Sequence, residues 1–188
     1  MLFSDEPART GWAEILALAE RLAPEVRLVP ADAAEQVRVL GLSHEVMSEG
    51  AMLWCARLLA IEAGRATNGR EGFPLQAARY LAPRYRSGTV PVPLLRARAA
   101  GILSHLATEL ARSSGPGFCG DTISAIDLYS AVAMHALVPL PDGLYPMVPA
   151  MRAAFEWMGR SLHGAMPAAL IAHRDYIVAR HFQLPIDL

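Results

Sequence analysis

Hydrophobic residues recur along most of the chain at spacings of three and four, the period of a helix packed on one side. The clearest stripe belongs to a segment that ends near Arg112; it comprises Leu95, Ala99, Ile102, Leu103, Leu106 and Leu110. A similar stripe runs from about Trp12 to Leu22 and comprises Trp12, Ile15, Leu16, Ala19 and Leu22. No run of residues alternates convincingly as strands do. The pattern therefore predicts an all-α bundle.

The longest helical pattern begins at Asp32, where Asp32 and Glu35 have the spacing of a capping box. Its apolar seam comprises Val37, Leu40, His44, Met47, Ala51, Trp54, Leu58 and Ile61. The glycine-rich stretch from Gly64 to Gly72 ends the pattern. We expect one long packed helix over this whole segment.

Shorter helices are expected in the rest of the chain, separated by loops rich in proline and glycine. They are predicted over 74–81, 124–138, 148–158 and 167–182, in addition to the helix that ends near residue 112. The segments 113–121 and 139–146 read as loops, and Pro24 and Pro30 bracket a linker.

The helix at Ser124 has the most sharply specified start. Ser124 can accept a hydrogen bond from the backbone N–H of Asp127, whose carboxylate can reach back to the N–H of Ser124. Ile123 and Leu128 occupy the flanking positions of a hydrophobic staple. Because the residues that follow are apolar nearly all round, we expect a buried helix. Loss of its cap should cost on the order of 0.5–2 kcal/mol.

Composition narrows the class of protein. All 17 basic residues are arginines spread along the chain, and the formal charge is −1. No basic stripe stands out, so we expect neither nucleic acid nor membrane as a partner.

The two cysteines, Cys55 and Cys119, indicate no disulfide framework. The start of the chain lacks a signal-peptide pattern, and the longest apolar stretch is too short to span a bilayer, which predicts a cytoplasmic protein.

The segment from Gly120 to Leu128, Gly-Asp-Thr-Ile-Ser-Ala-Ile-Asp-Leu, resembles the capping box and staple of the glutathione transferase C-terminal domain. The order of predicted helices agrees with that domain. The segments Leu2-Phe3-Ser4-Asp5 and Arg9 to Leu16 resemble the last strand and helix of the family's thioredoxin-like domain. The resemblance implies a thioredoxin-like remnant over 1–26 and a helical bundle of five or six helices over 27–188.

This resemblance also implies which functional residues to expect. The family's glutathione-activating serine, tyrosine or cysteine lies in a part of the thioredoxin-like domain with no counterpart in this chain, so we assign no catalytic residue. The family's remaining glutathione contacts align with Thr10, Gly11 and Trp12, although Gly11 and Trp12 stand where an acidic residue and a serine are usual. The substrate pocket corresponds to the long helix, and its residues would be His44, Met47, Ser48 and Ala51.

Several residues have a structural interpretation beside the functional one. His44, Met47 and Ala51 fit either a substrate pocket or the bundle core. The string Gly-Pro-Gly-Phe-Cys-Gly at 115–120 matches a dinucleotide-binding pattern, but no βαβ unit surrounds it, so we expect a plain loop. His173-Arg174-Asp175 matches a kinase tripeptide, and we interpret it as a coincidence on a helix surface.

No histidine pair has zinc-site spacing. Cys55 is expected to be inert, and Cys119 is the more reactive candidate.

The sequence is compatible with two functions, that of a binding protein and that of an enzyme. The first is a truncated glutathione transferase-like protein that binds an apolar ligand or a partner without activating glutathione. The alternative is an active transferase that conjugates glutathione to an apolar electrophile once an N-terminal half completes it. Met1 could also be an internal residue of a longer transferase. The first function predicts a homodimer, or a partner that covers the surface left by the missing domain. No cofactor is expected for the chain alone, and glutathione only for a completed protein.

Overall fold

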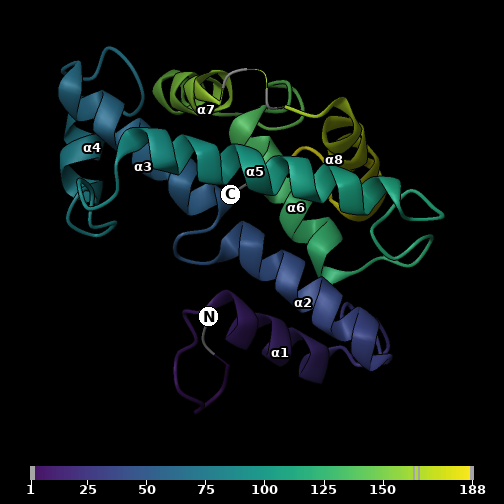
Figure 1. Ribbon diagram of the computed structural model, residues 1–188. Coiled ribbons are helices and arrows are strands. Elements are labelled where there is room, and N and C mark those ends of the chain that lie inside the picture. The colour runs from purple at the N-terminus through teal and green to yellow at the C-terminus, as the bar shows by residue number, and fades with distance from the viewer. Residues whose placement is uncertain (1–2, 163, 165, 187–188) are drawn as a thin grey trace.

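The protein is described by a computed structural model that covers residues 3–162, 164 and 166–186. Within these residues the chain forms eight α-helices and no β-sheet (Figure 1). The helices are α1 (Trp12–Leu22), α2 (Ala33–Met47), α3 (Met52–Ala66), α4 (Leu75–Leu81), α5 (Val92–Ala111), α6 (Ala125–Leu137), α7 (Pro149–Ser161) and α8 (Ala168–His181). The all-α prediction is therefore confirmed. Seven helices, α2 to α8, follow residue 27, more than the five or six that we expected.

The bundle is organised around two buried helices. α6 packs against α2, α7 and α8, whereas α3 packs along α5 and is covered by α4 (Figure 1). On α5, five of the six predicted stripe residues are buried, and Leu110 is half-buried; the five are Leu95, Ala99, Ile102, Leu103 and Leu106. Apolar side chains on facing helices thus form one core, which is the arrangement that the helical spacing predicts.

The two packing partners α6 and α7 approach most closely at a glycine. A Cβ atom added to Gly159 of α7 would lie 2.0 Å from the carbonyl oxygen of Leu137 at the end of α6. Real side chains do not approach a backbone atom so closely, so only glycine fits at this contact without moving one helix.

The prediction of one long helix after Asp32 is wrong, because the chain breaks between α2 and α3. Ser48 and Ala51 have extended backbone angles, and Gly50 has a φ of +76°, a conformation that glycine adopts without strain. The buried face of α2 differs from the one that the predicted seam implies. Its core residues are Val39, Leu42, Ser43 and Val46, whereas Val37 of the predicted seam is 73% exposed and His44 is exposed as well.

After the break, the predicted seam agrees with the structure. Ala51, Leu58 and Ile61 are buried, and Trp54 is half-buried. The error arose because the 3-and-4 spacing continued across two helices that bury different faces. A regular spacing alone does not show whether the backbone runs straight through Glu49-Gly50.

The helix predicted near the N-terminus is confirmed as α1, but the strand expected before it is not formed. Residues 3–10 follow turns and irregular backbone, while Met1 and Leu2 lie outside the described residues. Among the described residues this segment has no strand to pair with, and an isolated strand is not stable. No thioredoxin-like remnant is therefore seen among the described residues, and the segment expected to form it contains one helix, α1, at the bottom of Figure 1.

None of the described helices is both long enough and apolar enough to cross a membrane.

Candidate functional site

The start of α1 meets the end of α2 through hydrogen bonds between side chains. The indole Nε1 of Trp12 donates to Ser48 Oγ at 2.8 Å, and Ser48 Oγ lies 2.8 Å from Nδ1 of His44. Because the indole can only donate, the Ser48 hydroxyl accepts from it and can donate its own hydrogen to His44. The structure thus brings a predicted glutathione contact, Trp12, to two predicted pocket residues.

Aromatic packing from α6 holds this Trp12 junction in place. The ring of Tyr129 stands edge-on to Trp12 with centroids 5.7 Å apart, and its hydroxyl donates to the Trp12 carbonyl at 3.4 Å. Tyr129 was not among the residues predicted for a site. Its position two residues after Asp127 placed it on α6, but the pairing depends on how α1 packs across α6.

The other residues predicted for the pocket and the glutathione contact do not join the Trp12 junction, and their burial differs. Met47 is half-buried, whereas Ala51 is 2% exposed and belongs to the core. Thr10 and Gly11 are exposed at the start of α1, and Gly11 gives that helix no side-chain cap. For Ala51 the structure favours the core interpretation, and for His44 it excludes the buried-core interpretation because the side chain is exposed.

The carboxylate of Asp127 at the start of α6 is a buried centre of hydrogen bonds. Its Oδ2 accepts from the N–H of Ser124 at 2.8 Å and from the Ser124 hydroxyl at 2.5 Å. Its Oδ1 accepts from the N–H of Phe118 at 2.8 Å and lies 2.8 Å from Nε2 of His173. Both Ser124 and Asp127 are fully buried, and the capping box is present. The predicted buried cap is therefore confirmed, with two further donors.

Burial alone would raise the pKa of the Asp127 carboxyl, but the hydrogen-bond donors around it lower this pKa by more. Hydrogen bonds from His173, Ser124 and the Phe118 N–H hold the pKa of the Asp127 carboxyl below its usual value. The carboxylate is thus charged at neutral pH and joins α6, α8 and the loop before α6. Ile123 and Leu128, the predicted staple residues, flank this centre and are half-buried.

The interpretation of His173-Arg174-Asp175 as a surface coincidence is wrong for its first two residues. His173 and Arg174 are only 3% and 5% exposed, and the His173 ring packs edge-on against Phe118. One signal could have located them: Leu170, His173, Ile177 and Val178 have the spacing of a buried helical stripe. A histidine in such a stripe requires a buried polar partner, which Asp127 provides.

The Asp127 centre contains a serine, a histidine and an aspartate, but it does not have the geometry of a catalytic triad. In a triad the histidine lies between the serine and the carboxylate and removes the serine proton. Here the carboxylate lies between Ser124 and His173, so the histidine has no path to the serine hydroxyl. All three residues are buried, and the centre is structural.

The Gly-x-Gly-x-x-Gly loop before α6 has committed its backbone N–H groups. Those of Gly115 and Gly120 donate to Ser113 Oγ at 3.4 and 3.0 Å, and that of Gly117 donates to the Gly120 carbonyl at 3.0 Å. The Phe118 N–H donates to Asp127. A phosphate site needs free N–H groups that converge on the ligand, so the structure favours the plain-loop interpretation.

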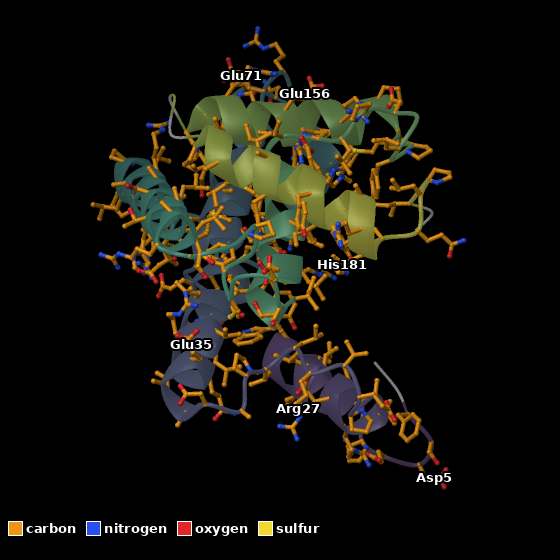
Figure 2. The ribbon with its side chains drawn as sticks, turned by 90° about the vertical axis from the view of Figure 1, so that its right-hand side faces the viewer. Asp5, Arg27, Glu35, Glu71, Glu156 and His181 are labelled. Atoms are coloured by element: carbon orange, nitrogen blue, oxygen red, sulfur yellow. The ribbon has the colours of Figure 1, made fainter. Side chains whose placement is uncertain are left out.

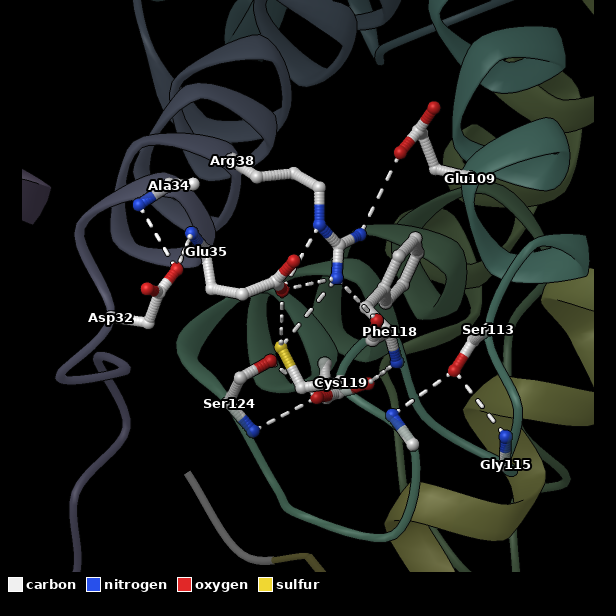
Figure 3. Close-up of polar contacts among 12 residues, drawn as sticks. Asp32, Ala34, Glu35, Arg38, Glu109, Ser113, Gly115, Phe118, Cys119 and Ser124 are labelled. Atoms are coloured by element: carbon white, nitrogen blue, oxygen red, sulfur yellow. Dashed lines mark hydrogen bonds and ion pairs between the residues drawn. The ribbon is translucent and has the colours of Figure 1, made fainter.

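A cleft of about 560 Å³ lies between the first turn of α2 and this loop (Figure 3). Its central group is Arg38, which donates to Glu35 at 2.8 Å and to the Phe118 carbonyl at 2.7 Å and lies 3.6 Å from Glu109. Arg38 therefore ties α2 to α5 and to the loop. Its charge is balanced within the protein, which leaves little of it for an anionic ligand.

Cys119 lines the same cleft, with its Sγ 3.8 Å from Arg38 and 3.9 Å from Glu35. Burial raises the pKa of the Cys119 thiol, and the hydrogen bond with Ser124 and the charge of Arg38 oppose this only in part. A thiol of raised pKa is a poor nucleophile at neutral pH. Cys55 is buried in α3, where burial raises its pKa too, so the structure gives neither cysteine the environment of a reactive thiol.

A third polar cluster surrounds His135 on α6. Its ring packs against Tyr145 at 4.3 Å, and its Nδ1 accepts from the Leu140 N–H at 3.1 Å. Burial, with the nearby charges of Arg174 and Arg152, lowers the pKa of His135 to about 4. Because the folded pKa lies below that of a free histidine, the neutral ring stabilises the fold fully above about pH 6.5.

We expect His135 to make the protein less stable as the pH falls from about 6.5 towards 4, by about 1–2 kcal/mol after allowance for partial exposure. Urea unfolding at a series of pH values measures this. His135→Leu should flatten the profile in that range, whereas replacement of the exposed His105 by glutamine should leave it unchanged. An equally steep profile in His135→Leu would disprove the assignment.

No cluster of three or more histidine, cysteine or acidic residues suited to a metal ion occurs in the described part of the chain. Comparison of the chain with family models, curated proteins and solved structures finds no match. Functional inference therefore depends on the residues and their geometry. The Trp12 junction (Trp12, His44, Ser48 and Tyr129) is the candidate site, because it unites residues predicted separately from two helices.

Proposed function

We propose that this chain is the helical half of a glutathione transferase-like protein and binds an apolar ligand or a protein partner without activating glutathione itself. The observation that carries the family assignment is the buried capping box of Ser124 and Asp127 at the start of α6. The loop Gly120-Asp121-Thr122 precedes it in the order that the resemblance requires. The helices before and after α6 also follow the expected order, except that α2 and α3 stand in place of one long helix.

The chemistry of the Trp12 junction supports a binding role over catalysis. Activation of glutathione needs a group that stabilises a thiolate. Gly11 has no polar side chain, and the Trp12 indole already donates to Ser48. The hydroxyls of Ser48 and Tyr129 are themselves bonded, to His44 and to the Trp12 carbonyl. The junction therefore offers no unbonded hydroxyl and no thiol for this task.

Exposed apolar side chains near α1 support the binding role itself. Among the described residues up to position 37, four large hydrophobic side chains are exposed: Phe3, Leu22, Val26 and Val37. Apolar side chains left in water are characteristic of interaction sites where they gather into a patch. A homodimer, or a partner seated against α1, would remove these side chains from water.

One observation favours the competing proposal, an active transferase completed by a thioredoxin-like half. Trp12 lies beside His44 and Ser48, as expected if a glutathione site adjoined a substrate pocket. The two proposals differ in whether the chain binds and uses glutathione.

Retention on immobilised glutathione, together with turnover of a generic electrophile, separates the two proposals. We expect neither retention nor turnover above the uncatalysed rate at micromolar protein. If both occurred, and replacement of Trp12 by alanine reduced them while the protein stayed folded, the chain would be a transferase and the proposal of a purely binding role would be wrong.

A further inference from the structure

Charge is distributed unevenly along the chain, although its total is near zero. Residues 52–100 contain eight arginines and two glutamates, whereas the remaining residues contain nine arginines and sixteen acidic residues. Along the sequence the arginines look scattered, because they form no continuous basic run. In the structure, α3 and α5 lie side by side and α4 packs on α3, which brings arginines from α3, from α4 and from the turn after α4 into one region.

Two arginines of α3 contact the turn that follows α4. Arg57 of α3 donates to the hydroxyl of Tyr85 at 2.6 Å, and Arg65 of α3 donates to Ser87 at 3.1 Å. Arg84 and Arg86 belong to the turn itself, and Arg79 lies on α4 one turn earlier. We call these five residues the α4 arginine patch: Arg57, Arg65, Arg79, Arg84 and Arg86. All five are exposed.

Only part of the patch is neutralised within the protein. Arg86 pairs with Glu49 at 2.5 Å, and Arg65 lies 3.9 Å from Glu62. Among the described residues no carboxylate pairs with Arg57, Arg79 or Arg84. Three guanidinium groups therefore have no carboxylate partner, although Arg57 and Arg84 each donate one hydrogen bond within the protein, to the Tyr85 hydroxyl and the Tyr80 carbonyl.

Aromatic rings hold two of these guanidinium groups in place. The Arg84 guanidinium carbon lies 3.7 Å from the centroid of the Tyr80 ring, and that of Arg57 lies 5.9 Å from the Tyr85 ring. Tyr85 in turn packs against Trp54 with centroids 4.4 Å apart. An arginine stacked on a ring loses less side-chain freedom when it binds a carboxylate, so binding there costs less entropy.

Exposed apolar residues continue the patch. Tyr80 is 61% exposed, and Val90, Val92 and Leu94 follow the turn with exposed side chains. Tyrosine and arginine beside apolar residues are the composition of a protein–protein interface. Helix α4, which carries Arg79, lies at the upper left of Figure 1, well away from α1.

We propose that the α4 arginine patch binds a short acidic segment of a protein partner that also carries apolar residues. Arginine forks match carboxylates in a bidentate manner, and the neighbouring apolar side chains suit a peptide. A nucleic acid strand fits less well, because it would extend from this small patch onto a surface with an excess of acidic residues and be repelled there. This surface is independent of the proposed function, which concerns the α1 side.

Fluorescence anisotropy with a labelled synthetic peptide tests the proposal. The probe is a peptide of about 12 residues that is rich in glutamate and contains two leucines, used at about 50 mM salt to limit screening. We expect the wild-type chain to bind it, and R79E/R84E to weaken binding at least about tenfold. R79Q/R84Q, which removes charge without reversing it, should weaken binding less.

A matched control changes two arginines elsewhere. R160E/R180E alters the net charge by the same amount on α7 and α8 and should change the affinity by less than about twofold. Far-UV circular dichroism confirms that each variant is folded.

Four results would overturn the proposal: no binding of the peptide, equal weakening by the control pair, tighter binding of a single-stranded oligonucleotide of equal charge, or self-association of the chain that R79E/R84E abolishes. The last result would identify a second copy, with its acidic residues, as the occupant.

Discussion

Replacement of Asp127 by alanine is expected to lower the free energy of unfolding by about 4 kcal/mol, the largest effect of any single side chain considered. The variant leaves two buried backbone N–H groups and the buried His173 Nε2 without an acceptor. Water cannot replace the carboxylate, because Asp127 and Ser124 are fully buried. Urea unfolding should show the loss, and the thermal midpoint should fall by roughly 8–16 °C at this chain length.

Two variants distinguish the role of Asp127 from a general effect of removing an acidic group. Asp121→Ala removes an exposed carboxylate six residues earlier and should change stability by less than about 0.5 kcal/mol. Asp127→Asn keeps the shape but turns one acceptor atom into a donor, so it should also destabilise strongly. If Asp127→Ala moved the thermal midpoint by less than about 1 °C, the buried capping centre would not exist as described.

Replacement of Gly159 by alanine should be the second most damaging change, with an expected loss of about 3 kcal/mol. The new methyl group would lie 2.0 Å from the Leu137 carbonyl oxygen, and a backbone atom cannot rotate away as a side chain can. α7 would have to move off α6, which would open the core around Ala154 and Met158. Thermal unfolding followed by circular dichroism measures the loss.

Gly101 provides the matched control for this change. It lies in the middle of α5, and an added Cβ would have no atom within 4 Å. Alanine there should stabilise the protein by about 0.5–1 kcal/mol, because alanine favours the helix over glycine. Opposite signs for the two variants would show that α6 and α7 touch at Gly159; equal stabilisation by both would show that they do not.

The sequence allowed the α5 and α6 helices to be predicted because their signals are local. The stripe from Leu95 to Leu106 and the spacing of Ser124 and Asp127 lie within single elements. The break between α2 and α3 was missed because one glycine with a positive φ interrupts an otherwise continuous apolar spacing.

The candidate sites were predictable only in part, because they depend on contacts between distant segments. Trp12 and Ser48 were each singled out, but only the packing of α1 on α2 shows that they meet. His173 lies 46 residues from Asp127, and nothing near His173 in the sequence indicates that partner. The arginine patch likewise arises from the packing of α3, α4 and the turn after α4.

Helix α1 projects from the bundle and has few contacts with its core. Figure 2 shows α1 and the segment before it extending from the rest of the bundle, with Asp5 at the far end and Arg27 near the linker. Few side chains other than Trp12 and Leu16 join α1 to the core cluster. A partner seated here would cover both the apolar side chains and the weakly anchored helix.

Sedimentation velocity over a range of protein concentrations, with and without an apolar dye, tests the binding role most directly. We predict that the chain self-associates or binds the dye. Leu22→Glu/Val26→Glu should weaken whichever interaction occurs at least about tenfold, because charges would replace exposed apolar groups beside α1. Val148→Glu/Met151→Glu, which alters exposed apolar residues at the start of α7, should leave both unchanged. A monomer that binds no dye at any concentration would contradict the account.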